Sequence, residues 1–420
     1  MNTVALIQKT KIAKGTVQLP GSKSISNRAL IMAELAGVAA KVQQLSDADD
    51  TVLLKKHLSF IRTCGSSGIP TIFDVKNAGT VARFLTAYLV SHEGEWLVTG
   101  TERMKERPIG VLVNALTKLG ARITYADKVG FLPIRIIGNE IHGGEISIET
   151  SMSSQYVSAI LIIGPYLEDG LKMNFVGDLV SKPYINMTVE MMKAFGAQVT
   201  LHDDCVIVSP QPYNTIEYQV EADWTSAAYW YELAALSKQS DLVIPGLARN
   251  SIQGDKVLAD LYEMLGVRTV FEEGAIRLLS SGDVASHFTY DFTGCSDLAL
   301  SVITTCAALK VKGTFTGIKN LKYKESDRLK SLTIELLKIG AVLTCENDRC
   351  HLTFVKEAID HDLTFDTYHD HRMAMSFAPL LMKYPSIRIN DSGVVEKSYP
   401  TFWNELSKLG VANITELKID

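Results

Sequence analysis

A short pattern of apolar and polar positions recurs along the chain. An amphipathic helical segment ends in a large apolar residue, a glycine follows, and a β-branched run comes next. The five glycines of this pattern lie 70 to 76 residues apart, and they are Gly120, Gly196, Gly266, Gly340 and Gly410. A glycine ends a helix there because it takes a positive φ without steric cost, and the β-branched run predicts a strand. The period indicates one supersecondary unit repeated, with two helices and about four strands per copy.

Capping residues and prolines predict where further helices start. These helices are expected from Asn77–Thr80 to Val90, from Pro108 at the first helical position to Leu119, from Ser151–Ser154 to Ile163, from Pro183 to Phe195, and from Asp370 to Leu381. Hydroxyls and cations recur at these N-termini, where the helix dipole is positive. Several helices are therefore expected to direct their positive ends toward one anionic ligand.

The segment Leu19–Arg28 combines a Pro-Gly pair with three serines and two cations. It precedes an apolar, alanine-rich segment, Ala29–Ala36, so it predicts a turn entering a helix, with one of its serines as the cap. The positive helix end beside Lys23 and Arg28 favours a bound anion such as phosphate. The segment is not a P-loop, because Lys23 does not follow a glycine. Taken alone, it is equally compatible with an ordinary capped helix.

Two segments are typical of crossovers between lobes. They are Pro20-Gly21 and Glu221–Thr225, the second of which separates a strand-like run from a helix. A chain that leaves one lobe at residue 20 and returns near residue 222 gives a discontinuous lobe, residues 1–20 with 223–420, and a continuous lobe, residues 21–222. The active site is then expected in the cleft between them.

Composition narrows the functional class. The 420 residues are 46% hydrophobic and 21% charged, which is typical of a soluble globular protein with room for two domains. A net charge of −5 argues against nucleic-acid and anionic-membrane partners, so an anion site needs a local group of cations. The six cysteines are scattered without a C-x-x-C pair and are expected to be reduced.

Targeting signals are not evident in the sequence. Lys9, Lys11 and Lys14 are not followed by the apolar core of a signal peptide. No run of 18 apolar residues is present either. A cytoplasmic protein is therefore expected.

The polar motifs, taken one at a time, have ordinary interpretations. Arg103–Arg107, Ser153–Gln155 and Lys324–Arg328 resemble solvated turns or helix caps. The sequence from His369 to Arg372 suggests metal binding at first sight. However, its two histidines are two residues apart, which does not place them on one helix face, and no other residues complete a zinc spacing. No metal site is predicted.

Together, the motifs resemble the 5-enolpyruvylshikimate-3-phosphate (EPSP) synthases, a family of enolpyruvyl transferases. The matching stretches are Leu19–Leu30, Asn77–Arg83, Arg103–Gly110, Ser153–Gln155, Gly177–Tyr184, Asn250–Asp255, Lys324–Leu329, Asp370–Met375 and Lys397–Pro400. The resemblance implies an α/β (α+β) fold of two lobes, an inside-out barrel with three β-α-β-α-β-β repeats per lobe. Phe84 and His369 depart from the family, which usually has proline and asparagine at these positions.

The resemblance also implies an activity. The family transfers the enolpyruvyl group of phosphoenolpyruvate to the 5-hydroxyl of shikimate 3-phosphate and releases phosphate, without a cofactor or metal. Asp297 matches the base that takes the hydroxyl proton, Glu325 matches the acid that protonates the methylene carbon, and Lys324 lies beside the base. His371 is assigned a supporting role only.

The same resemblance assigns binding residues. Those that match the shikimate 3-phosphate site are Lys23, Ser24, Arg28, Ser153, Ser154, Gln155, Ser181, Tyr184, Asp297, Asn320 and Lys324. Those that match the phosphoenolpyruvate site are Lys23, Gly79, Arg107, Gln155, Arg328, Arg372 and Lys397. Each substrate phosphate brings a charge of about −1.5 to −2, which the cations among these residues are suited to neutralise.

Two alternatives remain at this level. The sister enzyme that acts on UDP-N-acetylglucosamine usually carries a reactive cysteine before the arginine that Arg107 matches, and Thr101–Arg107 contains none. A non-catalytic phospho-ligand-binding relative is expected to lack Asp297 or Glu325, and both are present. The expected partners are the two small substrates, without nucleic acid or membrane, and the chain is expected to be a monomer.

Overall fold

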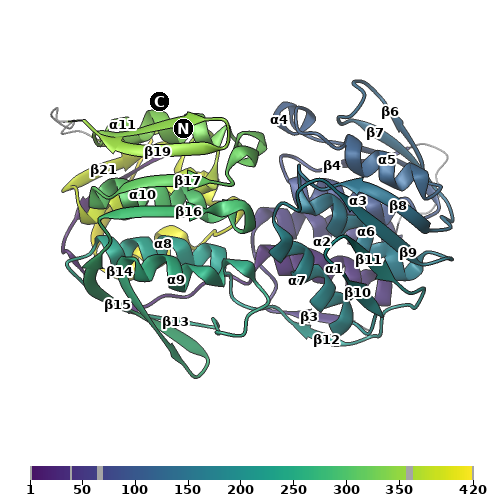
Figure 1. Ribbon diagram of the computed structural model, residues 1–420, viewed down its shortest axis with the longest axis horizontal. Helices are drawn as coiled ribbons and strands as arrows, with labels where there is room; N and C mark the ends of the chain where they lie inside the picture. The colour runs from purple at the N-terminus through teal and green to yellow at the C-terminus, as the bar shows by residue number, and fades with distance from the viewer. Residues whose placement is uncertain (1, 38–39, 64–69, 356–362, 419–420) are drawn as a thin grey trace. The chain divides into compact units, whose positions relative to one another are not determined.

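The computed structural model describes residues 2–37, 40–63, 70–355 and 363–418. The chain divides into two compact units, each of which is described by itself (Figure 1). Unit 1 consists of Met1–Ser22 with Glu221–Asp420, and unit 2 consists of Lys23–Val220. Within the described residues, each unit contains three sheets.

The sheets of unit 1 each have four strands. In spatial order they are β20 (Leu363–Phe365), β21 (Ser386–Ile389), β1 (Asn2–Gln8) and β22 (Ala412–Lys418); β14 (Leu265–Glu272), β15 (Ala275–Val284), β13 (Gln239–Pro245) and β2 (Ile12–Thr16); and β16 (His287–Asp291), β17 (Lys312–Thr316), β19 (Arg349–Phe354) and β18 (Ala341–Glu346). In each sheet, one pair of neighbouring strands is parallel and the other two pairs are antiparallel. The parallel pairs require crossover connections, which are helices in this fold.

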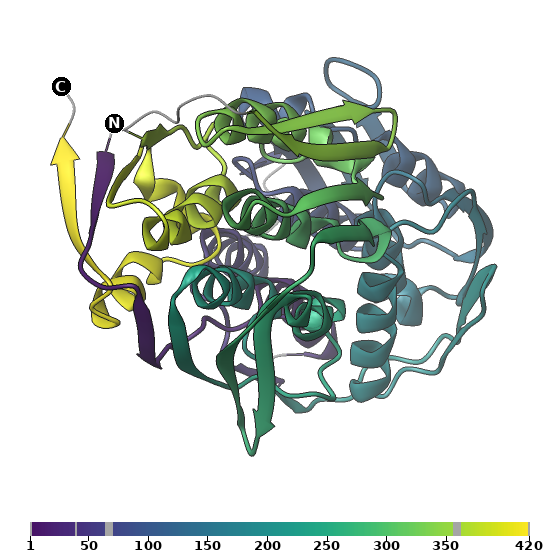
Figure 2. The same ribbon diagram turned by 60° about the vertical axis from the view of Figure 1, so that its left-hand side comes forward.

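The two ends of the chain complete one of these sheets. β1, near the N-terminus, pairs antiparallel with β22, near the C-terminus, and Figure 2 shows the two strands side by side. β2 likewise supplies the first strand of the sheet whose remaining strands begin at Gln239. The N-terminal segment of unit 1 therefore belongs to two repeats that are otherwise formed by later parts of the chain.

Unit 2 repeats the arrangement with one shortened copy. Its sheets are β4 (Thr71–Asp74), β5 (Gly94–Thr99), β7 (Ile134–Gly138) and β6 (Arg122–Tyr125); β10 (Val199–Leu201), β11 (Cys205–Val208), β9 (Leu171–Val176) and β8 (Gly144–Glu149); and the pair β12 (Glu217–Gln219) and β3 (Lys41–Gln43). The two-stranded sheet belongs to the copy whose glycine is missing from the sequence pattern. Residues 64–69, which follow its second helix and include Cys64, lie outside the described residues.

Helices fill the interior of each unit. The innermost helices are α8 (Trp224–Leu236), α10 (Ala299–Leu309) and α12 (His371–Phe377) in unit 1, and α1 (Lys23–Ala36), α3 (Gly79–Leu89) and α6 (Ser154–Ile163) in unit 2. The helices of each set contact one another. α8 is buried nearly all round, as expected for a helix without a polar face.

The remaining helices precede the later strands of their repeats, except α2, which lies between β3 and β4 of different sheets. They are α9 (Leu258–Glu263), α11 (Arg328–Leu337) and α13 (Phe402–Lys408) in unit 1, and α2 (Asp49–Thr63), α4 (Glu102–Lys105), α5 (Gly110–Lys118) and α7 (Lys182–Ala194) in unit 2. The strands show one buried and one exposed face, for example in β7, so the sheets cover the helices and face solvent. Among the described helices, none has both the length and the apolar character needed to cross a membrane.

The structure confirms the repeat inferred from the glycine pattern. All five glycines have a positive φ, between 67° and 101°. Gly266 differs from the prediction in one respect, because it lies within β14, at the irregularity between Leu265 and Val267, and does not directly end α9. The predicted crossovers lie side by side: Ser22 N donates to Glu221 O at 2.8 Å, and Asp223 N donates to Pro20 O at 3.0 Å.

Three local predictions were wrong. A serine of Leu19–Arg28 was expected to cap a helix that follows this segment. Instead, α1 already begins at Lys23, because the serine-rich segment continues the helical pattern of Ala29–Ala36, and Ser22 Oγ is buried without a hydrogen bond. Pro108 precedes Ile109, the N-cap of α5, and is not its first helical residue. Cys345 and Cys350 form a disulfide instead of remaining reduced, because the β18–β19 register places them directly opposite each other.

A buried carboxyl group in unit 1 leads to a prediction about stability. Glu232 in α8 is fully buried, and neither of its side-chain oxygens has a hydrogen-bond partner among the described residues. Burial raises the pKa of Glu232 well above its ordinary value. The folded protein therefore keeps this proton while the unfolded chain releases it above about pH 4.5, so stability is lost as pH rises, by up to about 1.4 kcal/mol per pH unit.

Glu232→Gln should therefore unfold at a higher urea concentration than the wild type at pH 8, and the difference should shrink toward pH 4. The amide resembles the neutral acid in size and removes the cost of keeping it protonated. Urea unfolding of both proteins at pH 4 to 8 measures this. Glu263→Gln, at an exposed position in α9, is the control and should leave the curve unchanged. A constant difference across pH would contradict the prediction.

Candidate active site

Unit 1 gathers charged side chains where α10, α11 and α12 begin. Asp297 lies in the 3₁₀ turn η4 (Ser296–Leu298) before α10, Arg328 is the first residue of α11, and Arg372 is the second of α12. We call the following residues the acid–base cluster: Asp297, Lys324, Glu325, Arg328, Asp370 and Arg372. Because the helices direct their positive ends here, the cluster favours anionic ligands.

The buried guanidinium of Arg328 joins three carboxylates. Its Nε and Nη2 donate to the two oxygens of Asp370 at 2.7 and 3.2 Å. Its Nη1 donates to Asp297 Oδ1 at 3.0 Å, and Nη2 also donates to Glu325 Oε2 at 2.9 Å. Burial acts to lower the pKa of Arg328, but the charges of Asp370, Glu325 and Asp297 outweigh it and raise the pKa. Arg328 therefore stays charged and holds the two candidate acid–base groups close together.

Asp297 is surrounded by cations. Arg372 Nη2 donates to Oδ2 at 3.1 Å, and Lys324 Nζ lies 3.2 Å from Oδ1, the oxygen that also accepts from Arg328. Burial acts to raise the pKa of Asp297, but Arg372, Lys324 and Arg328 outweigh it and hold the pKa well below its usual range. Asp297 is therefore ionised at neutral pH, which is the state that a general base requires.

The other predicted residues of unit 1 lie near this cluster or on elements that contact it. Asn320 Nδ2 donates to the hydroxyl of Ser296, the neighbour of Asp297, at 3.2 Å. Lys397 is half-buried at the end of η7 (Ser392–Lys397), which packs against α12. His371 is buried, and its Nδ1 lies 3.7 Å from Asp370 Oδ1.

The structure adds three residues to the surroundings of the acid–base cluster. Asp370 caps α12 and orients Arg328 with both oxygens. Tyr229 in α8 lies 3.4 Å from Arg372 Nη1. Asp255 is buried beside Thr225, and burial raises its pKa to about 6, with Asp297 adding to the effect. Asp370 and Asp255 stand in stretches that matched the family, whereas Tyr229 gives no signal because its helix is apolar.

In unit 2, the start of α3 is bordered by two guanidinium groups. A Cβ atom on Gly79 would lie 2.4 Å from Arg83 Nη1 and 2.5 Å from Arg107 Nη2. Arg107 Nη1 donates to Asn77 O at 3.1 Å, and no side chain caps the helix at Ala78. A helix start that its N-cap side chain does not cap, together with two arginines beside a glycine, is a suitable place for a phosphate or carboxylate. Arg83 was not among the predicted site residues.

The start of α6 adjoins this place. Ser153 caps the helix, and its hydroxyl accepts from Gln155 N at 3.3 Å, as the sequence predicted. Gln155 Nε2 donates to Thr80 Oγ1, in the first turn of α3, at 3.2 Å. Ser154 is buried in the same first turn. The predicted residues of α3 and α6 are thus brought together.

The start of α1 is tied to its neighbours through Lys23 and Arg28. Lys23 Nζ lies 3.2 Å from Asp50 Oδ2 in α2. Arg28 is buried and donates to Thr188 Oγ1 at 2.7 Å, to Ser24 O at 2.9 Å and to Ser158 Oγ at 3.1 Å. Burial lowers the pKa of Arg28 to about 10. Arg28 therefore links α1 to α6 and α7 and is already well bonded to the protein.

Two further predicted residues mark the start of α7. Ser181 is its N-cap, with φ of 58°, and its side chain makes no capping bond. The carbonyl of Tyr184 accepts from Thr188 Oγ1 at 2.8 Å, and its ring lies 5.9 Å from Arg28 Cζ. Tyr184 thus lies beside Arg28. Within unit 2, positive groups, hydroxyls and helix N-termini therefore recur at the starts of α1, α3, α6 and α7.

Known proteins resemble the chain over nearly its whole length. Residues 7–406 match the family model for EPSP synthase (3-phosphoshikimate 1-carboxyvinyltransferase). The 3-phosphoshikimate 1-carboxyvinyltransferase of Bacteroides fragilis strain YCH46 is 46% identical over 400 residues, which cover 94% of this chain and 95% of the relative. The enzyme of the same name from Vibrio cholerae strain M66-2 is 36% identical over 427 residues, with 96% and 98% covered.

Solved structures agree with the predicted fold class. An EPSP synthase from Acinetobacter baumannii matches with a TM-score of 0.76, and the match covers 100% of both chains. The sequence identity is 21%, so this likeness concerns the fold. The prediction of a two-lobed α/β architecture is confirmed.

Proposed function

Because the chain belongs to the EPSP synthase (3-phosphoshikimate 1-carboxyvinyltransferase) family, we propose that it transfers the enolpyruvyl group of phosphoenolpyruvate to the 5-hydroxyl of shikimate 3-phosphate. The observation that carries the proposal is the joint contact of Asp297 and Glu325 with one buried arginine, Arg328. This arrangement supplies two acid–base groups within a positively charged setting. The reaction needs both, since one proton leaves an oxygen and another is added to carbon.

The transfer proceeds by addition and then elimination. In the addition, Asp297 takes the proton of the 5-hydroxyl, and the hydroxyl oxygen attacks C2 of phosphoenolpyruvate. Glu325 is paired with Arg328 as a carboxylate, so it first takes a proton from solvent and then gives that proton to the methylene carbon. In the elimination, Glu325 takes a proton back from the new methyl group as the bond from C2 to the phosphate oxygen breaks. The phosphate leaves with the proton that Asp297 accepted, and Glu325 returns its proton to solvent, so both side chains return to their starting states.

The charges around Asp297 suit this sequence of events. Before substrates bind, Arg372, Lys324 and Arg328 keep the pKa of Asp297 low, which makes it a weak base. Two substrates with phosphate and carboxylate groups offset these positive charges. The pKa of Asp297 then rises toward the value that favours proton abstraction. Substrate binding therefore activates the base.

We assign the binding residues as follows. Shikimate 3-phosphate is bound by Lys23, Ser24, Arg28, Ser153, Ser154, Gln155, Ser181, Tyr184, Asp297, Asn320 and Lys324. Phosphoenolpyruvate is bound by Lys23, Gly79, Arg107, Gln155, Arg328, Arg372 and Lys397. The two guanidinium groups at Gly79 support the second assignment, because a side chain at this position would displace them.

We further propose that the family's two lobes are residues 1–20 with 223–420 and residues 21–222, with the crossovers as hinges. The hydrogen bonds between the two crossovers support this proposal, because they hold the two connecting segments side by side. We also propose that the enzyme acts as a monomer in the cytoplasm.

The decisive experiment measures phosphate release from phosphoenolpyruvate with either shikimate 3-phosphate or UDP-N-acetylglucosamine as acceptor. Release is expected with shikimate 3-phosphate alone, together with the enolpyruvyl product. Release with UDP-N-acetylglucosamine alone would favour the sister activity. Binding of shikimate 3-phosphate without any phosphate release would favour a non-catalytic relative.

A further inference from the structure

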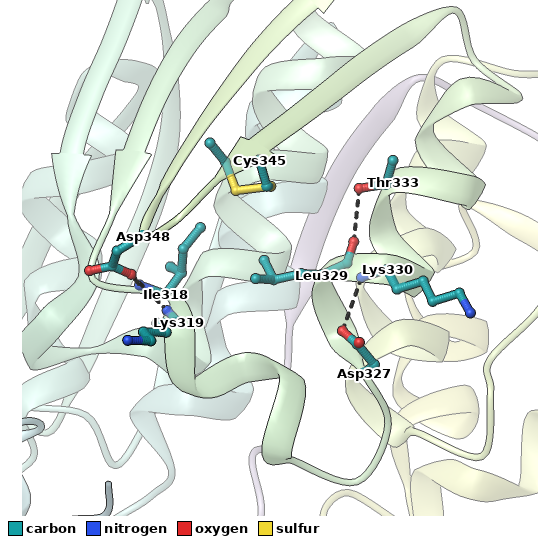
Figure 3. Close-up of a disulfide and its surroundings, with 9 residues drawn as sticks. Ile318, Lys319, Asp327, Leu329, Lys330, Thr333, Cys345 and Asp348 are labelled. Carbon is teal, nitrogen blue, oxygen red and sulfur yellow. Dashed lines mark hydrogen bonds between the residues drawn. A yellow bond between two sulfur atoms is a disulfide. The ribbon is translucent and has the colours of Figure 1, made fainter. Parts of the chain in front are cut away.

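The hairpin of β18 and β19 touches the segment that leads to the acid–base cluster. The carboxylate of Asp348, in the hairpin turn, accepts three backbone hydrogen bonds, and Figure 3 shows Asp348 beside two of the donor residues, Ile318 and Lys319. Its Oδ1 accepts from Ile318 N at 3.1 Å and from Lys319 N at 2.8 Å, and its Oδ2 accepts from Gly317 N at 3.3 Å. One side chain thus holds three consecutive N–H groups.

The anchored residues begin the 3₁₀ turn η5 (Lys319–Tyr323). N–H groups at the start of a helical turn lack partners within it and need an outside acceptor, which Asp348 provides. Asn320 in this turn donates to Ser296 Oγ, and Lys324 directly after it lies 3.2 Å from Asp297 Oδ1. The place where η5 starts therefore decides where these two side chains lie.

The hairpin presents Asp348 on a closed turn. Cys345 and Cys350 are opposite each other in the register and form a disulfide, five positions apart in sequence, around the turn (Figure 3). Asn347, directly before Asp348, has a positive φ of 56°. A turn that is linked covalently at its base has few alternative shapes, so Asp348 is held in a defined position.

We propose that Asp348 is a positioning residue for the transfer reaction. It anchors the start of η5 and so keeps Asn320, Lys324 and Glu325 in register with Asp297. The inference rests on the proposed function, which assigns those three residues their roles. Asp348 itself touches no reacting group; it acts through the backbone of Gly317–Lys319.

The test compares Asp348→Ala with Asp348→Asn. The alanine variant loses all three bonds, and its kcat should fall about 10-fold or more, since displacements near 1 Å can reduce rates by up to about 10²-fold. The KM for shikimate 3-phosphate should rise more than the KM for phosphoenolpyruvate, because Asn320 and Lys324 belong to the former site. The asparagine variant keeps the oxygen that serves Ile318 and Lys319, and it should recover most of the activity.

Glu346→Gln is the matched control, because this carboxylate stands on the same hairpin and accepts none of the three bonds. It should have the kinetic constants of the wild type. Hydrogen exchange of the peptide spanning residues 317–325 should be faster in Asp348→Ala than in this control. If hydrogen exchange in Asp348→Ala is unchanged, Asp348 does not anchor this segment. If exchange is faster but kcat is unchanged, Asp348 anchors the segment but is not a positioning residue. If the wild-type protein itself releases no phosphate, the proposed function is contradicted. Hydrogen exchange then still tests whether Asp348 anchors residues 317–319.

Discussion

Asp297→Asn is expected to lower kcat by at least about 10²-fold, the scale of general acid–base catalysis, while the protein still folds. Asparagine keeps the shape of the side chain and an oxygen that accepts from Arg328, but it cannot take the proton of the 5-hydroxyl. The KM for phosphoenolpyruvate should not rise. Arg372 and Lys324 lose an internal anion and become more available to the substrate. Phosphate release at saturating substrate concentrations, with each substrate varied in turn, measures both effects.

Asp327→Asn is the matched control for this prediction. Asp327 is a carboxylate in the same polar segment, but it caps α11 by accepting from Lys330 N at 3.1 Å (Figure 3). Because asparagine is also a good N-cap, this variant should keep both its stability and a kcat within a few-fold of the wild type. Equal losses in the two variants would indicate a general electrostatic effect. A kcat for Asp297→Asn close to that of the wild type would contradict the role of Asp297 as the base.

The repeat was predictable because it depends on local physics. A glycine that ends a helix needs only its own backbone conformation, and the five glycines stand at regular intervals in the sequence. Likewise, Ser153 was recognised as a cap because its hydrogen bond reaches only two residues along the chain. The start of α1 was harder to predict, because it depends on distant contacts. Arg28 donates to Ser158 Oγ in α6, and Ser26 Oγ accepts from Ser46 N.

The charged residues of the site were predictable as a set but not as a network. The resemblance indicated Asp297, Glu325 and Arg328 without showing that Arg328 contacts both carboxylates and Asp370. Asp370 has the spacing of an ordinary helix cap, which it also is, so its second role depends on the distant packing of α11 and α12. Asp348 gave no signal for the same reason. Its partners lie about thirty positions away, across a hairpin whose register the sequence alone does not establish.

Arg328→Met should destabilise unit 1 and abolish the transfer. In the wild type, the guanidinium of Arg328 contacts Asp370, Glu325 and Asp297. Methionine removes this positive charge. Removing one partner of a buried ion pair costs about 3–5 kcal/mol, because the remaining charges stay buried. The free energy of unfolding from urea titration should fall by about this amount at pH 7. The deficit should be smaller at pH 5 than at pH 7, because the loss of Arg328 removes one of the charges that hold the pKa of Asp297 low.

Arg277→Met provides the matched control, since Arg277 also donates to both oxygens of one aspartate, Asp241, at 2.6 and 2.8 Å. Its side chain is 42% exposed, against 1% for Arg328, so its loss should cost no more than about 1 kcal/mol. Adding Asp370→Asn to Arg328→Met should restore part of the stability, because one uncompensated charge is removed. It should not restore turnover, because Asp297 and Glu325 still lack the cation that holds them together. Equal costs for the two arginines would contradict the central place of Arg328.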